Sequence, residues 1–120
     1  MDRQTVHEYI RKKYKASPEY PWRSYPGYAV FRHEDNKKWF ALVMDIPRSR
    51  LGLEEDEIID VVNLKTDPVA AGSLRLEKGI FPAYHMNKDK WISVALDGSV
   101  DDEKIKMLLD QSFELTKTPH

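Results

Sequence analysis

Cysteine is absent from this 120-residue sequence, so the chain forms no disulfide, no thiolate metal site and no cysteine nucleophile. No apolar run approaches the roughly 20 residues that a membrane-spanning helix needs. A charged helical pattern stands at the start, where a secretory signal would be apolar. The formal net charge of −1 also removes the overall basicity common among nucleic-acid binders. We therefore expect a soluble cytoplasmic protein without a membrane partner, in which any nucleic-acid contact comes from a local patch.

Motifs of catalysis and of cofactor binding are also lacking. The sequence contains no Gly-x-Ser-x-Gly, no phosphate-binding loop and no dinucleotide fingerprint. The acidic run Glu54–Glu57 lacks the ligand spacing of a calcium loop. The histidines are scattered, without the spacing of metal ligands, at His7, His33, His85 and His120. We expect no enzymatic activity, no cofactor and no metal site.

What the sequence does contain is a succession of helical and strand patterns. Val6, Ile10 and Tyr14 recur at helical spacing and predict an amphipathic helix from Asp2 to about Tyr14. Runs of β-branched and aromatic residues predict strands over 28–33, 39–46, 58–64, 81–86 and 91–96. Two further helices are predicted, one from Asp67-Pro68 to about Glu77, and one over 101–115. Gly79 would end the former helix, and Ser99 with Asp102 resembles a capping box before the latter.

A connector rich in proline and aromatic residues precedes the first strand. Three prolines prevent a regular helix between Ser17 and Gly27. Its aromatic residues are Tyr20, Trp22 and Tyr25, which predict a segment that packs over the core rather than a free linker.

The order of these elements predicts the fold class. Strands joined as hairpins form an antiparallel sheet, and the terminal helices need a surface that buries their apolar stripes. We therefore expect an α+β fold, a two-layer sandwich of an antiparallel five-stranded sheet with the N- and C-terminal helices packed on one face. No linker divides the chain, which predicts a single domain over 1–120.

Several stretches of the chain carry a family resemblance. In order, they are Gly27–Arg32, Lys38–Ala41, Val62–Lys65 with Asp67-Pro68, Gly79-Ile80, Pro82–Lys88, Trp91–Val94 and Leu96–Val100. In these stretches the chain resembles the MmcQ/YjbR family of small bacterial proteins. The resemblance implies a fold like that of the frataxin/CyaY proteins. It also implies DNA binding through two β-hairpin wings.

The candidate nucleic-acid contacts lie in the two hairpins and on the sheet face away from the helices. Cationic and amide side chains reach phosphates and base edges, and aromatic rings stack on bases. The candidates are Arg32, Lys38, Lys65, His85, Asn87, Lys88, Lys90 and Trp91. Hairpin turns also favour Asn, Asp and Lys for conformational reasons, so solvated turns are the alternative interpretation. Trp91 could equally belong to the core.

Two further functions stay open, and both use the same sheet face. A protein-interaction or chaperone-like adaptor would hold a protein partner there, and the near-neutral net charge favours it. A small anionic ligand would instead use Asn63 and Lys65, which share strand parity and so one face, together with His85. On the predicted strand, His85 faces away from Tyr84 and Met86. We expect a monomer in each case.

Overall fold

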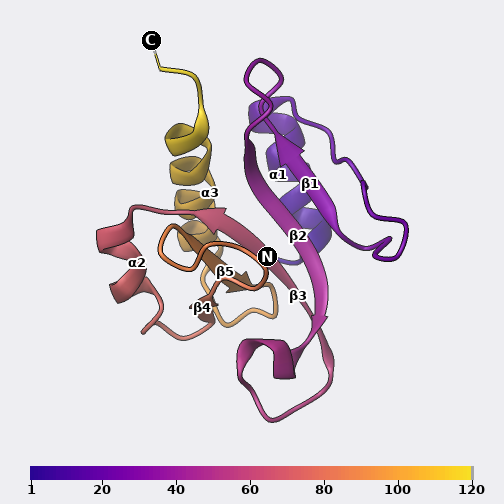
Figure 1. Cartoon of the computed structure of the whole chain (residues 1–120), viewed down its shortest axis with the longest axis vertical. Helices are drawn as coiled ribbons and strands as arrows, with labels where there is room; N and C mark the ends of the chain where they lie inside the picture. The colour runs from indigo at the N-terminus through magenta and orange to yellow at the C-terminus, as the bar shows by residue number, and fades with distance from the viewer. Residues whose placement is uncertain (120) are drawn as a thin grey trace.

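The computed structural model describes residues 1–119, and His120 lies outside the described residues. Figure 1 shows the elements in chain order. They are α1 (Arg3–Tyr14), β1 (Ala29–Arg32), β2 (Trp39–Pro47), the short 3-10 helix η1 (Arg48–Leu51), β3 (Ile58–Lys65), α2 (Pro68–Leu74), β4 (Ile80–Pro82), β5 (Trp91–Ala95) and α3 (Asp102–Thr116). The predicted order of helices and strands is confirmed.

The five strands form one antiparallel sheet in the order β1-β2-β3-β5-β4. Leu42 lies opposite Asn63 on β3, and Asn63 lies opposite Ser93 on β5. A bulge interrupts the β1–β2 register between Phe31 and Arg32.

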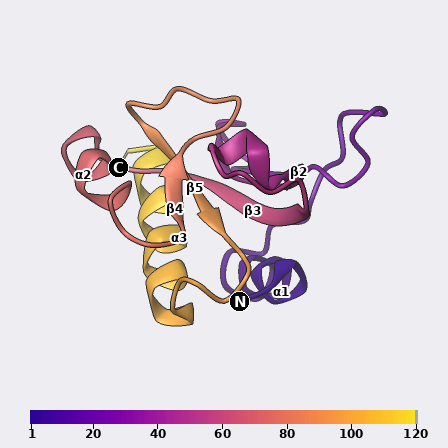
Figure 2. The ribbon, with the colours of Figure 1, turned by 90° about the horizontal axis from the view of Figure 1, so that it is seen from below.

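Helices α1 and α3 lie on the same side of the sheet, as Figure 2 shows, which confirms the predicted two-layer sandwich. Val6 and Ile10 of α1 and Leu109 of α3 are fully buried there. They pack with sheet residues that face the helices, among them Phe31, Phe40, Val43, Val62, Leu64, Ile92 and Val94. Burial of each such large apolar side chain contributes roughly 1.5–3 kcal/mol, so this layer supplies most of the hydrophobic stabilisation.

Aspartate side chains cap two of the helices, and the cap at Asp67 is the one that the sequence predicts. Asp2 caps α1 by accepting from the backbone N–H of Thr5 at 2.8 Å. Asp67 caps α2 in the same way through the N–H of Val69, with Pro68 at the first helical position. Helix α2 ends at Leu74, however, three residues before the predicted end.

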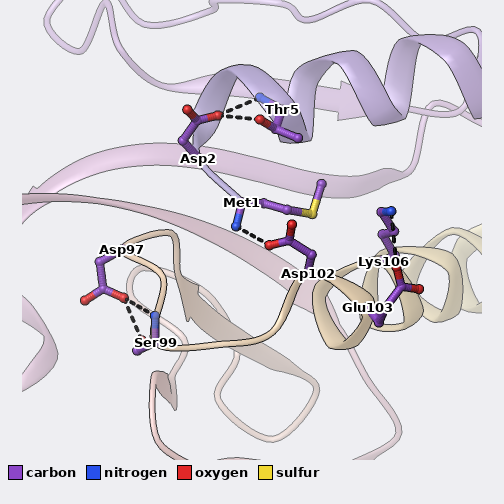
Figure 3. A network of polar contacts seen from close by, with 8 residues as sticks. All are labelled: Met1, Asp2, Thr5, Asp97, Ser99, Asp102, Glu103 and Lys106. Carbon is purple, nitrogen blue, oxygen red and sulfur yellow. Dashed lines mark hydrogen bonds and ion pairs between the residues drawn. The ribbon is translucent and has the colours of Figure 1, made fainter.

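The predicted capping box at α3 is wrong (Figure 3). The Ser99 N–H and hydroxyl both donate to Asp97 Oδ1, at 3.0 and 2.6 Å, so Ser99 serves the strand exit. Asp101 is the N-cap residue and makes no side-chain capping bond. The carboxylate of Asp102 accepts instead from the amine of Met1 at 2.6 Å, which ties the start of α1 to the start of α3.

The second predicted hairpin is also shorter than expected. Strand β4 stops at Pro82, which has no N–H to continue the ladder, so the predicted strand 81–86 is wrong beyond this point. Residues 83–90 form a loop that arches over the sheet face opposite α1 and α3 (Figure 2). Within it His85 adopts a φ of 64°, a left-handed conformation. The predicted alternation of His85 with Tyr84 and Met86 is therefore wrong.

The connector before β1 closes one edge of the sheet. Glu19 and Val30 exchange backbone N–H···O bonds of 2.9 and 2.8 Å, an isolated bridge beside β1. None of the helices formed by residues 1–119 combines the length and apolar character needed to cross a membrane.

Candidate nucleic-acid interface

An aromatic cleft lies on the sheet face opposite α1 and α3. Its volume is about 340 Å³. Strand β2 supplies its floor, and the connector and the 83–90 loop supply walls. The lining residues are Trp22, Tyr25, Tyr28, Trp39, Leu42, Met44, His85 and Met86. The face that we expected to be open is therefore covered by two loops, and the cleft lies between them.

The rings of the cleft hold one another in place. Trp22 packs edge-to-face on Trp39, with centroids 5.7 Å apart at 81°, and on Tyr28, at 6.1 Å and 80°. Tyr25 stacks on Tyr28 with centroids 4.7 Å apart. Such pairs are favoured by the ring quadrupoles. The cleft is thus built from π surfaces that pack against one another.

Buried polar groups anchor the wall formed by the 83–90 loop. Asn63 and Ser93 have no exposed surface. The Asn63 side-chain amide donates to the Tyr84 carbonyl at 2.8 Å, the Tyr84 N–H donates to Ser93 Oγ at 3.0 Å, and Ser93 Oγ donates to Asn63 Oδ1 at 2.5 Å. Asn63 does lie on the predicted face, but its polar atoms hold the loop. The structure does not bring it into the cleft beside His85 as a ligand-binding pair.

The tip of this loop carries three of the predicted contacts. Asn87 Oδ1 accepts from the N–H of Asp89 at 2.8 Å, and its carbonyl accepts from Lys90 and Trp91. Asn87 therefore shapes the turn. Lys88 and Lys90 are exposed, as expected for phosphate contacts.

Lys65 and Trp91 are register partners on β3 and β5. Both share the face of Asn63 and Ser93 and are partly buried. Their role as nucleic-acid contacts stays a prediction. Trp91 does not line the cleft itself.

Two of the predicted contacts, Arg32 and Lys38, lie in or beside the first hairpin. Arg32 forms a two-pronged ion pair with Glu19, with Nε–Oε2 and Nη2–Oε1 distances of 2.6 and 2.7 Å, so its charge is already neutralised. The turn is tied to the end of α3, since Asn36 donates to the Thr116 carbonyl at 2.9 Å. Lys38 is exposed beside this turn.

Charges of both signs lie around the cleft, since Asp45 follows the lining residue Met44 and Asp89 stands between Lys88 and Lys90. Among the described residues that line it, none carries a carboxylate. Five cationic side chains on or next to the surrounding elements take part in none of the ion pairs found within residues 1–119. They are Arg23, Arg50, Lys65, Lys88 and Lys90. Burial raises the pKa of Tyr28, nearby Tyr84, Tyr25 and Asp45 add to this, and the Arg50 charge opposes it. Tyr28 therefore stays protonated at neutral pH.

Sequence reasoning missed most of the cleft lining. Trp22 and Tyr25 were expected to pack over the core, and their aromatic character was the available signal. Tyr28 and Met44 looked like ordinary strand residues, and only the β2 backbone with its two covering loops brings them to one cavity. Met86 was assigned to a strand that in the structure ends at Pro82, so it lies in the 83–90 loop instead.

Comparisons with known proteins agree with this architecture. The YjbR family model matches residues 11–115. The chain is 42% identical over 117 residues to YyaQ of Bacillus subtilis, covering 98% of this chain and 99% of that protein. It is 36% identical over 90 residues to YjbR of Escherichia coli K12, covering 74% and 75%. A crystal structure from Pseudomonas syringae matches with a TM-score of 0.96 and 50% identity, covering 98% of this chain and 100% of that one.

Proposed function

Because the chain belongs to the YjbR family, we propose that it is a non-catalytic protein that binds nucleic acid, DNA in particular, through the cleft face. The observation that carries this is the pairing of an aromatic cleft, whose described lining residues carry no carboxylate, with the exposed Lys88 and Lys90 on the loop that forms one of its walls. Proteins that bind single strands use this combination, in which rings stack on bases and cations follow the phosphates.

The hairpin contacts fit this role unequally. Lys88 and Lys90 are exposed on the loop that also carries His85 into the cleft, so one segment can serve both base and backbone. Arg32 is held by Glu19, and we assign it no phosphate. The proposal thus moves the main contact from two projecting wings to the second hairpin loop and the cleft beside it.

A salt titration tests the proposal. Fluorescence anisotropy of a labelled single strand and of a duplex, at about 50 and 200 mM salt, should show affinity that falls steeply as salt rises, because phosphate neutralisation releases counterions. The double variant Lys88→Glu, Lys90→Glu should bind more weakly and with a shallower salt dependence. Lys12→Glu, Lys78→Glu changes the net charge equally at exposed positions outside the cleft and should bind like the parent chain.

Absence of binding at low salt, or equal losses in the two double variants, would contradict the proposal. The adaptor function would then be favoured, with a protein partner occupying the aromatic cleft. The proposal also includes a cytoplasmic location and a monomer, which cell fractionation and sedimentation test directly.

A further inference from the structure

We propose that the cleft takes one unpaired base of a nucleic-acid strand, so that the protein distinguishes unpaired nucleotides from fully paired ones. This inference rests on the proposed function and makes it more specific. It concerns the aromatic cleft alone, whereas the salt dependence above concerns the lysines at its margin.

The dimensions and walls of the cleft suit a single base. Its volume of about 340 Å³ lies at the lower end of the roughly 300–1,000 Å³ typical of small-molecule sites. Leu42 and Met44 form an apolar floor, while Trp22 and Trp39 cross at 81° above it. A flat ring system can lie against one of these faces and meet the edge of the other.

The Tyr28 hydroxyl gives this apolar site a polar group. Tyr28 is 9% exposed and lines the cleft, and its phenol is protonated at neutral pH, since burial only raises a pKa that is already near 10. It can therefore donate a hydrogen bond to a carbonyl or ring nitrogen on a base edge.

His85 adds a ring on the 83–90 loop. Its backbone has a φ of 64°, which is uncommon for a residue other than glycine and is often found at binding sites. The imidazole packs on the Tyr84 ring with centroids 3.9 Å apart, and His85 is exposed. This conformation places a planar side chain in the cleft lining on the same loop as Lys88 and Lys90.

The charges near the cleft favour a nucleic-acid base over an organic cation as its occupant. Rings at right angles also suit organic cations, but such sites gain from a nearby carboxylate. Among the described lining residues there is none. Asp45 lies close enough to act on the Tyr28 pKa, and it is paired with Arg3 at 3.8 Å. A neutral aromatic group that carries an anion fits this environment best.

A base inside a regular duplex cannot enter the cleft, since its neighbours cover both of its faces. Extrusion costs unstacking and unpairing energy, which is smallest for a base that is already unpaired. The protein should therefore prefer a strand with an unpaired base over a fully paired duplex of the same length.

The test uses a set of DNA probes of equal length at one low salt concentration. They are a fully paired duplex, a duplex with one unpaired nucleotide, and the same duplex with an abasic residue at that position. The unpaired base should bind about tenfold or more tighter than the other two, as expected for one stacked base. Tyr25→Ala should remove most of this preference. Tyr20→Ala should retain it, because Tyr20 is comparably exposed on the same connector but does not line the cleft.

Outcomes separate this inference from the function on which it rests. Salt-dependent binding that is equal for the three probes would overturn the inference and leave the proposed function intact. No binding to any probe would remove both. The affinity for free deoxynucleoside monophosphates is measured as well. If a free nucleotide bound more tightly than the DNA probe with an unpaired base, the proposal that the cleft takes a base of a nucleic-acid strand would be overturned.

Discussion

The side-chain amide of Asn63 donates a 2.8 Å hydrogen bond to the backbone carbonyl of Tyr84 from a fully buried position on β3. Asn63 Oδ1 accepts from Ser93 at the same time. One buried side chain therefore connects two strands of the sheet to the loop that forms a wall of the cleft.

Replacing Asn63 by Ala should release this loop. The Tyr84 carbonyl and the Ser93 hydroxyl would each lose a buried partner, and the free energy of unfolding should fall by about 1–3 kcal/mol. Amide hydrogen exchange should accelerate over 83–90 more than in α1 or α3. Uniform acceleration across the chain would show that Asn63 stabilises the whole sheet and not this loop.

The Ser112 hydroxyl should stabilise the contact between α3 and strands β2 and β3. Its hydroxyl donates to the Phe40 carbonyl at 2.5 Å and accepts from the Lys65 N–H at 2.9 Å, so a buried side chain of α3 bonds where the β2–β3 ladder ends. Ser112→Ala leaves both backbone groups unpaired and should cost about 1–3 kcal/mol in urea denaturation. The exposed Ser73 in α2 is the matched site, and Ser73→Ala should change stability by less than about 0.5 kcal/mol.

Stability should decrease as the pH falls from about 7 to about 5.5. Burial lowers the pKa of His33, with the charge of Lys38 contributing and Asp35 and Glu114 opposing, and burial also lowers the pKa of His7. The unfolded chain therefore takes up protons at a pH where the folded chain does not, so acidification favours unfolding. His33 is neutral in the fold, where its Nε2 meets Thr116 Oγ1 at 2.8 Å.

Urea unfolding midpoints measured across this pH range should fall as the pH falls. His33→Gln should make this dependence on pH shallower, whether or not the substitution also changes the stability at pH 7. The additional change His7→Gln should flatten the profile further. An unchanged slope in the double variant would assign the pH dependence to other groups.

Gly79 and Gly72 should respond in opposite directions to alanine. Gly79 has a φ of 84°, and a Cβ there would meet Ser99 Oγ and lie 2.6 Å from Val100 Cγ2. Gly79→Ala should therefore destabilise by about 2 kcal/mol or more. Gly72 lies in α2 with open space around its Cα, so Gly72→Ala should stabilise by up to about 1 kcal/mol. Thermal melts of the two variants check both signs.

Periodic patterns were sufficient to predict the layers of the fold. Val6 and Ile10 mark the buried stripe of α1, and both are fully buried against the sheet. Such signals are local, because a helix or strand reports its own spacing. The parity of Asn63 on β3 was likewise predictable, since alternation along a strand needs no knowledge of its neighbours.

The candidate site was less predictable because its residues meet through tertiary structure. An Asn on the non-helical face looks available for binding, and only the return of Tyr84 over the sheet shows its amide to be occupied. Arg32 looks like a free cation until Glu19 is found beside it. The aromatic pattern that continues past Pro82 favours a strand, but the 83–90 segment folds over the sheet, with His85 in a left-handed conformation.

The bridge between Glu19 and Val30 has a consequence for the behaviour of the protein at high concentration. It occupies backbone groups on the outer side of β1, while the opposite edge strand is three residues long and ends in Pro82. Both edges thus offer little backbone to a strand from another molecule, and unprotected edges are a common route to aggregation. We therefore expect little edge-to-edge pairing between molecules at high concentration, although an aromatic cleft is exposed on one face of the sheet.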